Sequence, residues 1–323
     1  MAPDQTVKFR GHGLPGPLPV SRFRLQFRAE KPYRIGGYRG SAWRGLLGHA
    51  LKKLVCITRG GRCPECMIYR SCVYPYIFET PEERARGAEP AVEAAPHPYV
   101  LAVAPEWQPR AVEGETVEVT LIGEGVRAAV YVLHALREGA ARGIGAARVE
   151  LKLEGIGQEE TTGGGWRPAL LPGGLLDVRE AATPAPPPVP ARARVRLITP
   201  LRIRREQDLV EPERLGWDEF VAAVLRRLAL LTRYHTAAMW RMDHAGLRAL
   251  AAAADVERRL GWQDWARYSN RQQRKIPMGG VVGEFRVEMK GLEPLWPLLW
   301  VGQWVHAGKG AVMGLGRYSL EAL

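Results

Sequence analysis

A proline-rich stretch near the middle of the chain limits the possible folds more than any other feature. The segment AATPAPPPVPARARV covers residues 181–195. Each proline lacks an amide donor and fixes its own φ, so the segment favours an extended linker over a helix or a central strand. We therefore expect two domains, residues 1–180 and 196–323, with the linker between them. With 323 residues, 46% of them hydrophobic, the chain can bury a core in each domain.

Strand and helix patterns alternate on both sides of this linker. Apolar residues recur with strand or helix spacing in several segments. In the first half, strands are predicted at 21–29, 115–123 and 147–155, and helices at 41–55 and 126–140. In the second half, strands are predicted at 193–203 and 283–291, with a long helix at 217–240, a further helix and a terminal segment at 316–323. The fold class is therefore α+β, with two tandem ferredoxin-like (RRM-like) domains.

The charge of the chain narrows the choice of partner. A net charge of +12 and a pI near 9.8 favour a polyanion, nucleic acid before an anionic membrane surface. The longest apolar run, residues 292–305, is shorter than the roughly 18 residues that a membrane span needs. The N-terminus also lacks the pattern of a secretory signal. We expect a cytoplasmic protein that binds nucleic acid.

All four cysteines fall within 17 residues, which indicates a metal site rather than disulfides. Cys56, Cys63, Cys66 and Cys72 have the spacing C-x6-C-x2-C-x5-C. Four thiolates would close the coordination shell of Zn(II), which predicts a structural zinc site. An iron–sulfur cluster takes the same ligands, and unliganded thiols are the third interpretation.

A glycine-rich tail is the second motif with possible chemistry. The segment HAGKGAVMGLGRY places Gly308, Gly310, Gly314 and Gly316 around Lys309, with Arg317 beside them. Exposed amides and two cations suit a phosphate chain, whereas the alternative is a structural turn before the last strand. His306 directly precedes the loop and could touch the same phosphates.

Three segments together resemble a known family. The tail LLWVGQWVHAGKGAVMGLGRYSL, the segment WARYSNRQQRKIPMGGVVGEF and the early RGSAWRGLLGHALKKLVC with its cysteines resemble the CRISPR pre-crRNA-processing endoribonucleases of the RAMP superfamily. The subgroup indicated has a four-cysteine N-terminal insertion. The resemblance implies two ferredoxin-like domains that cleave CRISPR repeat RNA without a catalytic metal. The ribose 2′-hydroxyl attacks the neighbouring phosphate and leaves a 2′,3′-cyclic phosphate and a 5′-hydroxyl.

The same resemblance implies a catalytic group on the first helix. Its histidine would be His49, its lysine Lys52 or Lys53, and its tyrosine Tyr38 or Tyr33. The helical pattern agrees, because Leu46, Ala50 and Leu54 are expected to form the inward stripe, which turns His49 outward. An imidazole can move a proton in either direction near neutral pH. The alternative is an ordinary solvated histidine. His235 lies on the apolar stripe of the long helix and is predicted to be a core residue.

Basic residues elsewhere could contact RNA. Arg202, Arg204 and Arg205 end a predicted strand. The segment that begins at Trp262 interleaves aromatic residues with Arg267, Arg271, Arg274 and Lys275. Aromatic rings stack on unpaired bases and arginines bind phosphates, although a helix with core tryptophans and solvated arginines is the alternative.

The expected partners are CRISPR repeat RNA or crRNA, with other CRISPR effector subunits as further candidates. A non-catalytic RAMP subunit that binds guide RNA and a zinc-containing DNA-associated protein are the competing functions.

Overall fold

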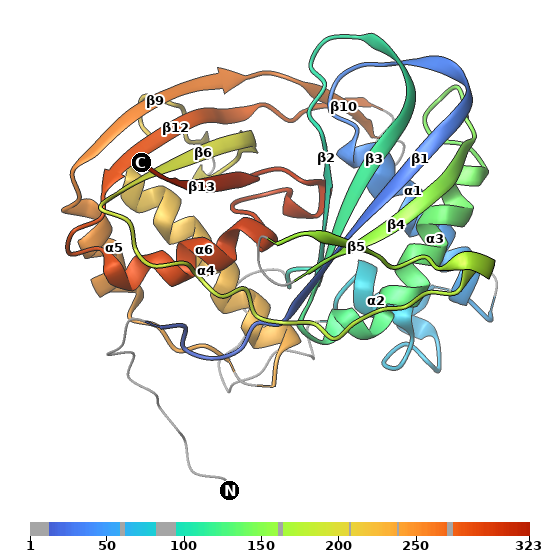
Figure 1. The fold of residues 1–323 in the computed structure, drawn as a ribbon, viewed down its shortest axis with the longest axis horizontal. Coiled ribbons are helices and arrows are strands. Elements are labelled where there is room, and N and C mark those ends of the chain that lie inside the picture. The colour runs from blue at the N-terminus through green and yellow to red at the C-terminus, as the bar shows by residue number, and fades with distance from the viewer. Residues whose placement is uncertain are drawn as a thin grey trace, which may run out of the picture.

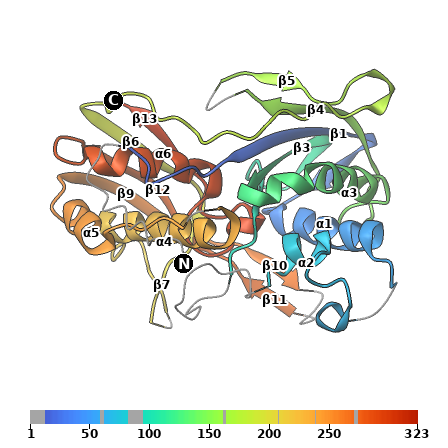
Figure 2. The same cartoon turned by 90° about the horizontal axis from the view of Figure 1, so that it is seen from below.

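The computed structural model describes residues 13–58, 62–81, 95–160, 164–206, 208–237, 239–269 and 274–323. Two α+β units lie side by side, and each has helices packed against one face of an antiparallel sheet (Figure 1 and Figure 2). The predicted fold class, two tandem ferredoxin-like domains, is confirmed.

The first unit has the ferredoxin-like order of elements. It contains β1 (Val20–Ile35), α1 (Gly40–Val55), α2 (Val73–Phe78), β2 (Tyr99–Val103), β3 (Arg110–Ile122), α3 (Ala129–Ala141), β4 (Leu151–Glu159) and β5 (Trp166–Pro168). The sheet order is β2-β3-β1-β4-β5. In β1, Phe23, Leu25 and Phe27 are buried under the helices, while Arg24 and Gln26, which alternate with them, lie on the opposite face of the sheet.

The second unit repeats this arrangement. It contains β6 (Arg192–Leu201), β7 (Arg204–Arg205), β8 (Asp208–Leu209), α4 (Trp217–His235), α5 (His244–Ala252), β9 (Val256–Gln263), β10 (Ala266–Ser269), β11 (Arg274–Pro277), β12 (Gly280–Glu288), α6 (Trp296–Val305) and β13 (Tyr318–Ala322). The sheet order β13-β6-β12-β9 corresponds to β4-β1-β3-β2 of the first unit. Short 3₁₀ helices lie at Cys63–Glu65, Gly123–Ala128, Pro172–Gly174, Glu293–Leu295 and Ala311–Met313.

The two hydrophobic cores meet at the boundary between the units. Val100 of β2 packs in the second core, while Met278 and Leu315 of the second unit pack in the first. Strand β6 begins at Arg192, inside the segment that we expected to be linker. None of the helices in the described part of the chain combines the length and the apolar character that crossing a membrane requires.

Several local predictions were wrong, and each error has a physical cause. Strand β2 was missed because it is buried along its whole length and shows no alternation, and β9 was missed because most of its side chains are exposed. The segment after Trp262 forms strands rather than the helix considered as an alternative. In α1, the inward residues are Trp43, Leu47, Ala50 and Leu51, whereas Leu46 is only half-buried and Leu54 is exposed.

Candidate active site and cysteine site

The outer side of α1 carries His49. The side chain is exposed, and its Nδ1 lies 2.8 Å from the carbonyl oxygen of Gly45. A carbonyl only accepts, so Nδ1 carries the proton and Nε2 is the acceptor of the neutral ring. Gly45 has open space where a Cβ would lie, so nothing from this residue blocks the imidazole. His49 therefore presents a basic nitrogen on an accessible helix face.

The two lysines of α1 lie in different surroundings. Lys53 is exposed four residues after His49. Lys52 is half-buried, with its Nζ 5.5 Å from the centre of the Tyr74 ring, and it lines the pocket that contains the cysteines. The structure thus leaves Lys53 on the His49 side of the helix and turns Lys52 toward α2.

The predicted tyrosine does not join His49. Tyr38 lies before the first turn of α1, and nine residues at 1.5 Å each separate Gly40 from His49, about 13 Å along the axis. Its ring is buried next to Trp107 and Trp265, and burial raises the pKa of its hydroxyl. Tyr33 is bound to Glu115 through its hydroxyl, and burial followed by this bond raises its pKa. We correct the prediction for Tyr38, because the structure makes it a packing residue between the two units.

The glycine-rich loop packs between the units instead of exposing a row of amides. All four glycines have positive φ. A Cβ on Gly314 would lie 2.0 Å from the Tyr38 hydroxyl, and one on Gly316 would lie 1.8 Å from the Ala307 carbonyl oxygen. Five amides of the loop already donate to carbonyls of the protein, namely those of Lys309, Met313, Gly314, Leu315 and Gly316. For these amides the phosphate prediction is wrong, and the structural turn is what the structure shows.

His306 and Arg317 at the ends of this loop are also engaged. His306 is 3% exposed, and its Nδ1 donates to the Leu315 carbonyl oxygen at 3.2 Å. Burial, and then the nearby Arg317, lower the pKa of His306 well below its usual value. The ring therefore lies inside the protein, away from a surface that RNA could reach. Arg317 is half-buried and forms an ion pair with Glu118 at 3.2 Å.

The cations after β6 divide into bound and exposed groups. Arg202 donates to the Gly279 carbonyl oxygen, and its own carbonyl accepts from the Lys309 amide at 2.9 Å. Burial lowers the pKa of Arg202, with Arg204 adding to the shift. Arg205 pairs with Glu219, which raises its pKa. Arg204 and Lys309 are exposed, and the described residues offer neither of them an ion pair.

The predicted aromatic and basic segment forms the hairpin β10–β11. Arg267, Arg274 and Lys275 occupy paired positions of its strands. Arg271 lies outside the described residues. Trp265 at the root of the hairpin packs against Tyr38, with ring centres 5.4 Å apart, which brings this part of the second unit to the start of α1.

A cluster at the junction of the two units was not predicted from the sequence. Arg24 of β1 lies over the Trp166 ring at 3.9 Å and pairs with Glu118, which also holds Arg317 of the second unit. Burial opposes ionisation of Glu118, but the guanidinium groups of Arg317, Arg22 and Arg24 outweigh it and lower the pKa. Nearby, Glu159 accepts from Trp304 at 2.7 Å. The only signal in the sequence is the alternation of arginine with apolar residues in β1.

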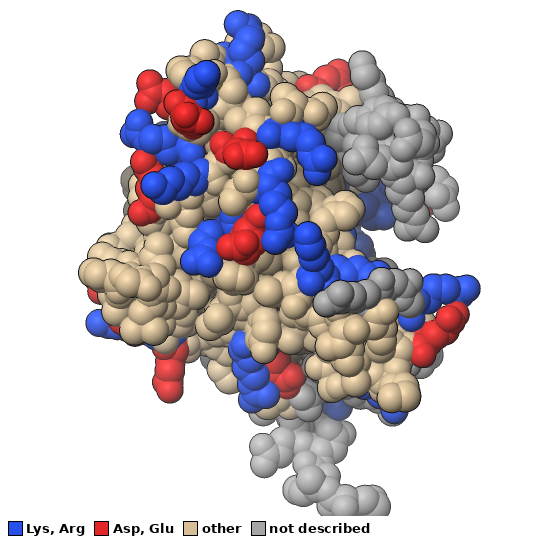
Figure 3. Space-filling model, turned by 90° about the vertical axis from the view of Figure 1, so that its right-hand side faces the viewer, with Lys and Arg blue, Asp and Glu red and all other residues tan. Residues whose placement is uncertain are grey.

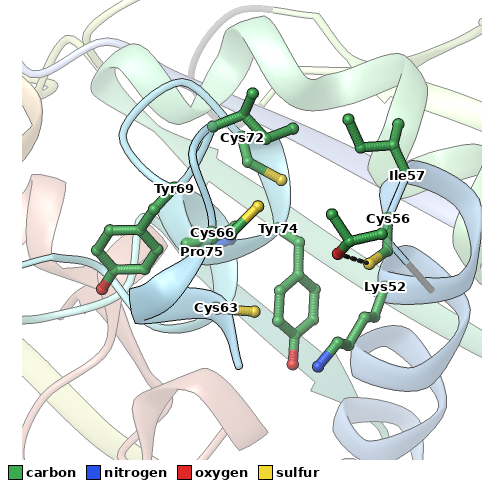
Figure 4. Close-up of a pocket in the computed structure, with 11 residues that line it drawn as sticks. Lys52, Cys56, Ile57, Cys63, Cys66, Tyr69, Cys72, Tyr74 and Pro75 are labelled. Atoms are coloured by element: carbon green, nitrogen blue, oxygen red, sulfur yellow. Dashed lines mark hydrogen bonds between the residues drawn. The ribbon is translucent and has the colours of Figure 1, made fainter. Parts of the chain in front are cut away.

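The four cysteines line one pocket at the end of α1. Cys56 follows the helix, and the sulfurs of Cys63, Cys66 and Cys72 point toward it from the following loop (Figure 4). All four residues are half-buried and free of disulfides. Burial raises the pKa of Cys63, Glu79 adds to this and Lys52 opposes it. As the described side chains stand, no three of the His, Cys, Asp and Glu residues are arranged to hold a metal ion, so the zinc site stays a prediction.

Charges on the outer side of the first unit are mixed. On the face shown in Figure 3, basic and acidic side chains alternate, with uncharged areas between them. Some cations of the first unit are paired, among them Arg28 with Glu113 and Glu154. This face therefore does not form one continuous cationic patch.

Two protein-family models match consecutive parts of the chain. A model described as an N-terminal domain matches residues 18–180, and the model of the CRISPR-associated endoribonuclease Cas6 matches residues 195–318. No curated protein matches the chain in sequence.

Solved structures share the fold over nearly the whole chain. A product complex of Cas6 (TTHB231) has a TM-score of 0.56 at 16% identity, over 94% of this chain and 99% of that chain. Thermus thermophilus Cas6 (TTHB231) has a TM-score of 0.53 at 15% identity, over 94% of this chain and 99% of that chain. A partial Cas6-RT-Cas1–Cas2 complex has a TM-score of 0.53 at 14% identity, over 95% of this chain and 47% of that chain. Residues 195–318 therefore match the family of the CRISPR-associated endoribonuclease Cas6, and the fold shared over nearly the whole chain agrees with this match.

Proposed function

We propose that this endoribonuclease cleaves CRISPR repeat RNA by attack of a ribose 2′-hydroxyl, with His49 as the general base and without a catalytic metal. The observation that supports this most directly is the 2.8 Å distance between Nδ1 of His49 and the Gly45 carbonyl oxygen, which leaves Nε2 available on an exposed face. Nε2 takes the proton of the 2′-hydroxyl as the O2′–phosphorus bond forms. The bond from phosphorus to the 5′-oxygen breaks, which yields a 2′,3′-cyclic phosphate and, after protonation, a 5′-hydroxyl.

Lys53 is the cation that we assign to this step. It is exposed one turn after His49, so its ammonium can approach the same phosphate. A positive charge there stabilises the charge that develops on the phosphate oxygens, and the ammonium can supply the proton that the leaving oxygen needs.

RNA affinity in this proposal comes from exposed cations of the second unit. Lys309 and Arg204 are exposed, and the carbonyl of Arg202 binds the Lys309 amide. Phosphate contacts of this kind make binding fall as the salt concentration rises. The unpaired bases and the shape of the repeat hairpin then supply specificity. Contacts with other CRISPR proteins and a cytoplasmic location stay predictions.

The cysteine pocket completes the proposal as a structural zinc site. The donor set suits Zn(II), because four thiolates fill its tetrahedral shell, and all four thiols line the same pocket. The thiols would have to close in to bind the ion. A bound zinc would tie the loop between α1 and α2, which contains few buried side chains.

Substrate analogues test the chemistry without changing the protein. Once wild-type protein has revealed the cut site in a CRISPR repeat RNA, a 2′-deoxy nucleotide directly before the scissile phosphate should abolish cutting. The matched control has the 2′-deoxy nucleotide one position away and should be cut at the normal rate. Cutting of the first RNA would overturn the mechanism, as would a loss of cutting in EDTA that leaves the thermal stability of the protein unchanged. If no repeat RNA is cut, the protein acts as a binding subunit.

A further inference from the structure

Helix α1 carries two consecutive lysines, Lys52 and Lys53, whose side chains lie on different sides of the helix. Lys52 is half-buried and lines the cysteine pocket, where its ammonium lies 5.5 Å from the centre of the Tyr74 ring. A cation over an aromatic face is attracted by the electrons of the ring. The position of Lys52 is thus set by the cysteine side of the molecule.

Packing against α2 separates the cysteine side of α1 from the His49 side. A Cβ on Gly48 would lie 2.4 Å from the Phe78 ring, so the absence of a side chain lets α2 approach the helix here. Tyr74 and Phe78 of α2 stack with ring centres 5.6 Å apart, and Lys52 lies one turn after Gly48 on the same flank. His49 and Lys53 remain on the exposed side.

The cysteine pocket is small and is lined by all four thiols. Its volume is about 20 Å³, which is close to the space that one water molecule needs. The described lining contains the four thiols, neutral side chains and a single charged group, the ammonium of Lys52. Figure 4 shows this ammonium beside the Tyr74 ring, on the side of the pocket formed by α1.

Charge balance explains why a cation belongs in this lining. Four thiolates with one Zn(II) have a net charge of −2, and a charge in a half-buried site is screened less than in water. Glu79 interacts with Cys63 and opposes this balance, but its side chain is exposed. Arg62 is nearby in the chain, but it is exposed and pairs with Glu65 at 3.1 Å. Lys52 is therefore the cation placed to offset the tetrathiolate.

We propose that Lys52 is a positioning residue of the four-cysteine metal site, where its ammonium compensates the charge of the bound tetrathiolate, and that the RNA-cleaving side of α1 uses Lys53 alone. This inference rests on the proposed zinc site. It also resolves the choice between the two lysines that the family resemblance leaves open.

Metal affinity of the full-length protein tests the assignment. Zinc affinity is measured by competition with a chromogenic chelator, and the site is identified by the thiolate-to-metal absorption band of the Co(II) form. Lys52→Met should weaken zinc binding about tenfold or more, as loss of an outer partner of a metal site does. Lys52→Arg should restore most of the affinity, and Lys53→Met is the matched control that should bind zinc like the wild type. Glu79→Gln should shift the affinity in the opposite direction, toward tighter binding.

The possible failures are distinguishable. If the wild type takes up neither zinc nor Co(II), the metal site is wrong and the assignment of Lys52 falls with it. If the wild type binds zinc and Lys52→Met binds it equally well, only the assignment of Lys52 is wrong. Thermal melting separates a folding defect from a metal effect: Lys52→Met should have a smaller zinc-dependent rise in Tm than the wild type. A lower Tm without metal combined with the full zinc-dependent rise would show a packing role on Tyr74 and overturn the proposal.

Discussion

The first helices of the two units, α1 and α4, occupy equivalent places in the fold, and each carries a histidine with a different role. His235 of α4 is fully buried, with Nε2 donating to the Pro96 carbonyl oxygen at 2.7 Å and Nδ1 accepting from the Tyr76 hydroxyl at 3.2 Å. His49 of α1 is exposed and has one nitrogen bound to the protein. The two units therefore share a fold, but their histidines on α1 and α4 have different environments. The free nitrogen on α1, not the fold position, marks the candidate catalytic histidine.

The largest expected effect is on cleavage by a His49→Ala variant. Loss of a general base should slow single-turnover cutting by about 10² to 10⁴-fold. Affinity for the uncleavable 2′-deoxy repeat should change little, because the imidazole contributes to the transition state. His134→Ala on α3 is the control, a histidine of the first unit that lies on another helix. Equal rates for His49→Ala and wild type would remove the distinction between α1 and α4.

The mirror experiment is His235→Phe, which should reduce stability rather than cleavage. Phenylalanine leaves the Pro96 carbonyl and the Tyr76 hydroxyl without their partner on α4, and a buried polar group left unpaired costs about 1–3 kcal/mol. Urea unfolding should show this decrease in the free energy of unfolding. At a temperature where the variant is folded, repeat cutting should continue at close to the wild-type rate. A large loss of cutting in the folded variant would contradict the structural role of His235.

A substitution at Gly48 tests the close packing of α1 against Phe78 of α2. A Cβ at this position would meet the Phe78 ring, which is stacked with Tyr74 and Tyr99 and cannot move freely. Gly48→Ala should therefore lower the free energy of unfolding by about 1–3 kcal/mol, the usual cost of overpacking. Chemical denaturation measures the change. Unchanged or increased stability would show that α2 does not pack this closely on α1.

Acid should destabilise the protein through its buried histidines. The ring of His97 stacks with both Phe78 and Tyr99, and burial lowers the pKa of His97 from 6.5 to about 3. Between these two pKa values the unfolded chain binds a proton that the folded chain does not, so the free energy of unfolding falls as the pH decreases through this range. The slope is at most about 1.4 kcal/mol per pH unit for each such histidine. His97→Phe should have a shallower slope in denaturation measured across this range, and an identical slope in both proteins would refute the assignment.

The sequence pattern of a single helix or strand predicted which of its sides is buried, but it did not predict which elements pack against each other. The period of β1 and of α4 identified their buried sides, because each element packs one face on a core. The exposed position of His49 was predicted, although the stripe used to place it was out of phase by about one residue, since α2 and α3 cover the two flanks of α1. The glycine-rich loop was misread because glycine permits close approach to a phosphate and to another strand equally well. Only the tertiary structure shows that β2 and Tyr38 occupy that space.

The smallest expected effect is the difference in stability between alanine variants of Gly45 and Gly48, two of the three glycines of α1. A Cβ added at Gly45 would have nothing within 4 Å, and this glycine lies in the middle of the helix, on the exposed side beside His49. Alanine costs less backbone entropy than glycine in a helix, so Gly45→Ala should raise the free energy of unfolding by about 0.5–1 kcal/mol, the opposite sign to Gly48→Ala. The two variants make the same chemical change one turn apart, so any shared effect on helix propensity cancels in their comparison. If both variants lose stability, the outer side of α1 is also covered, and His49 could not be reached by RNA as proposed.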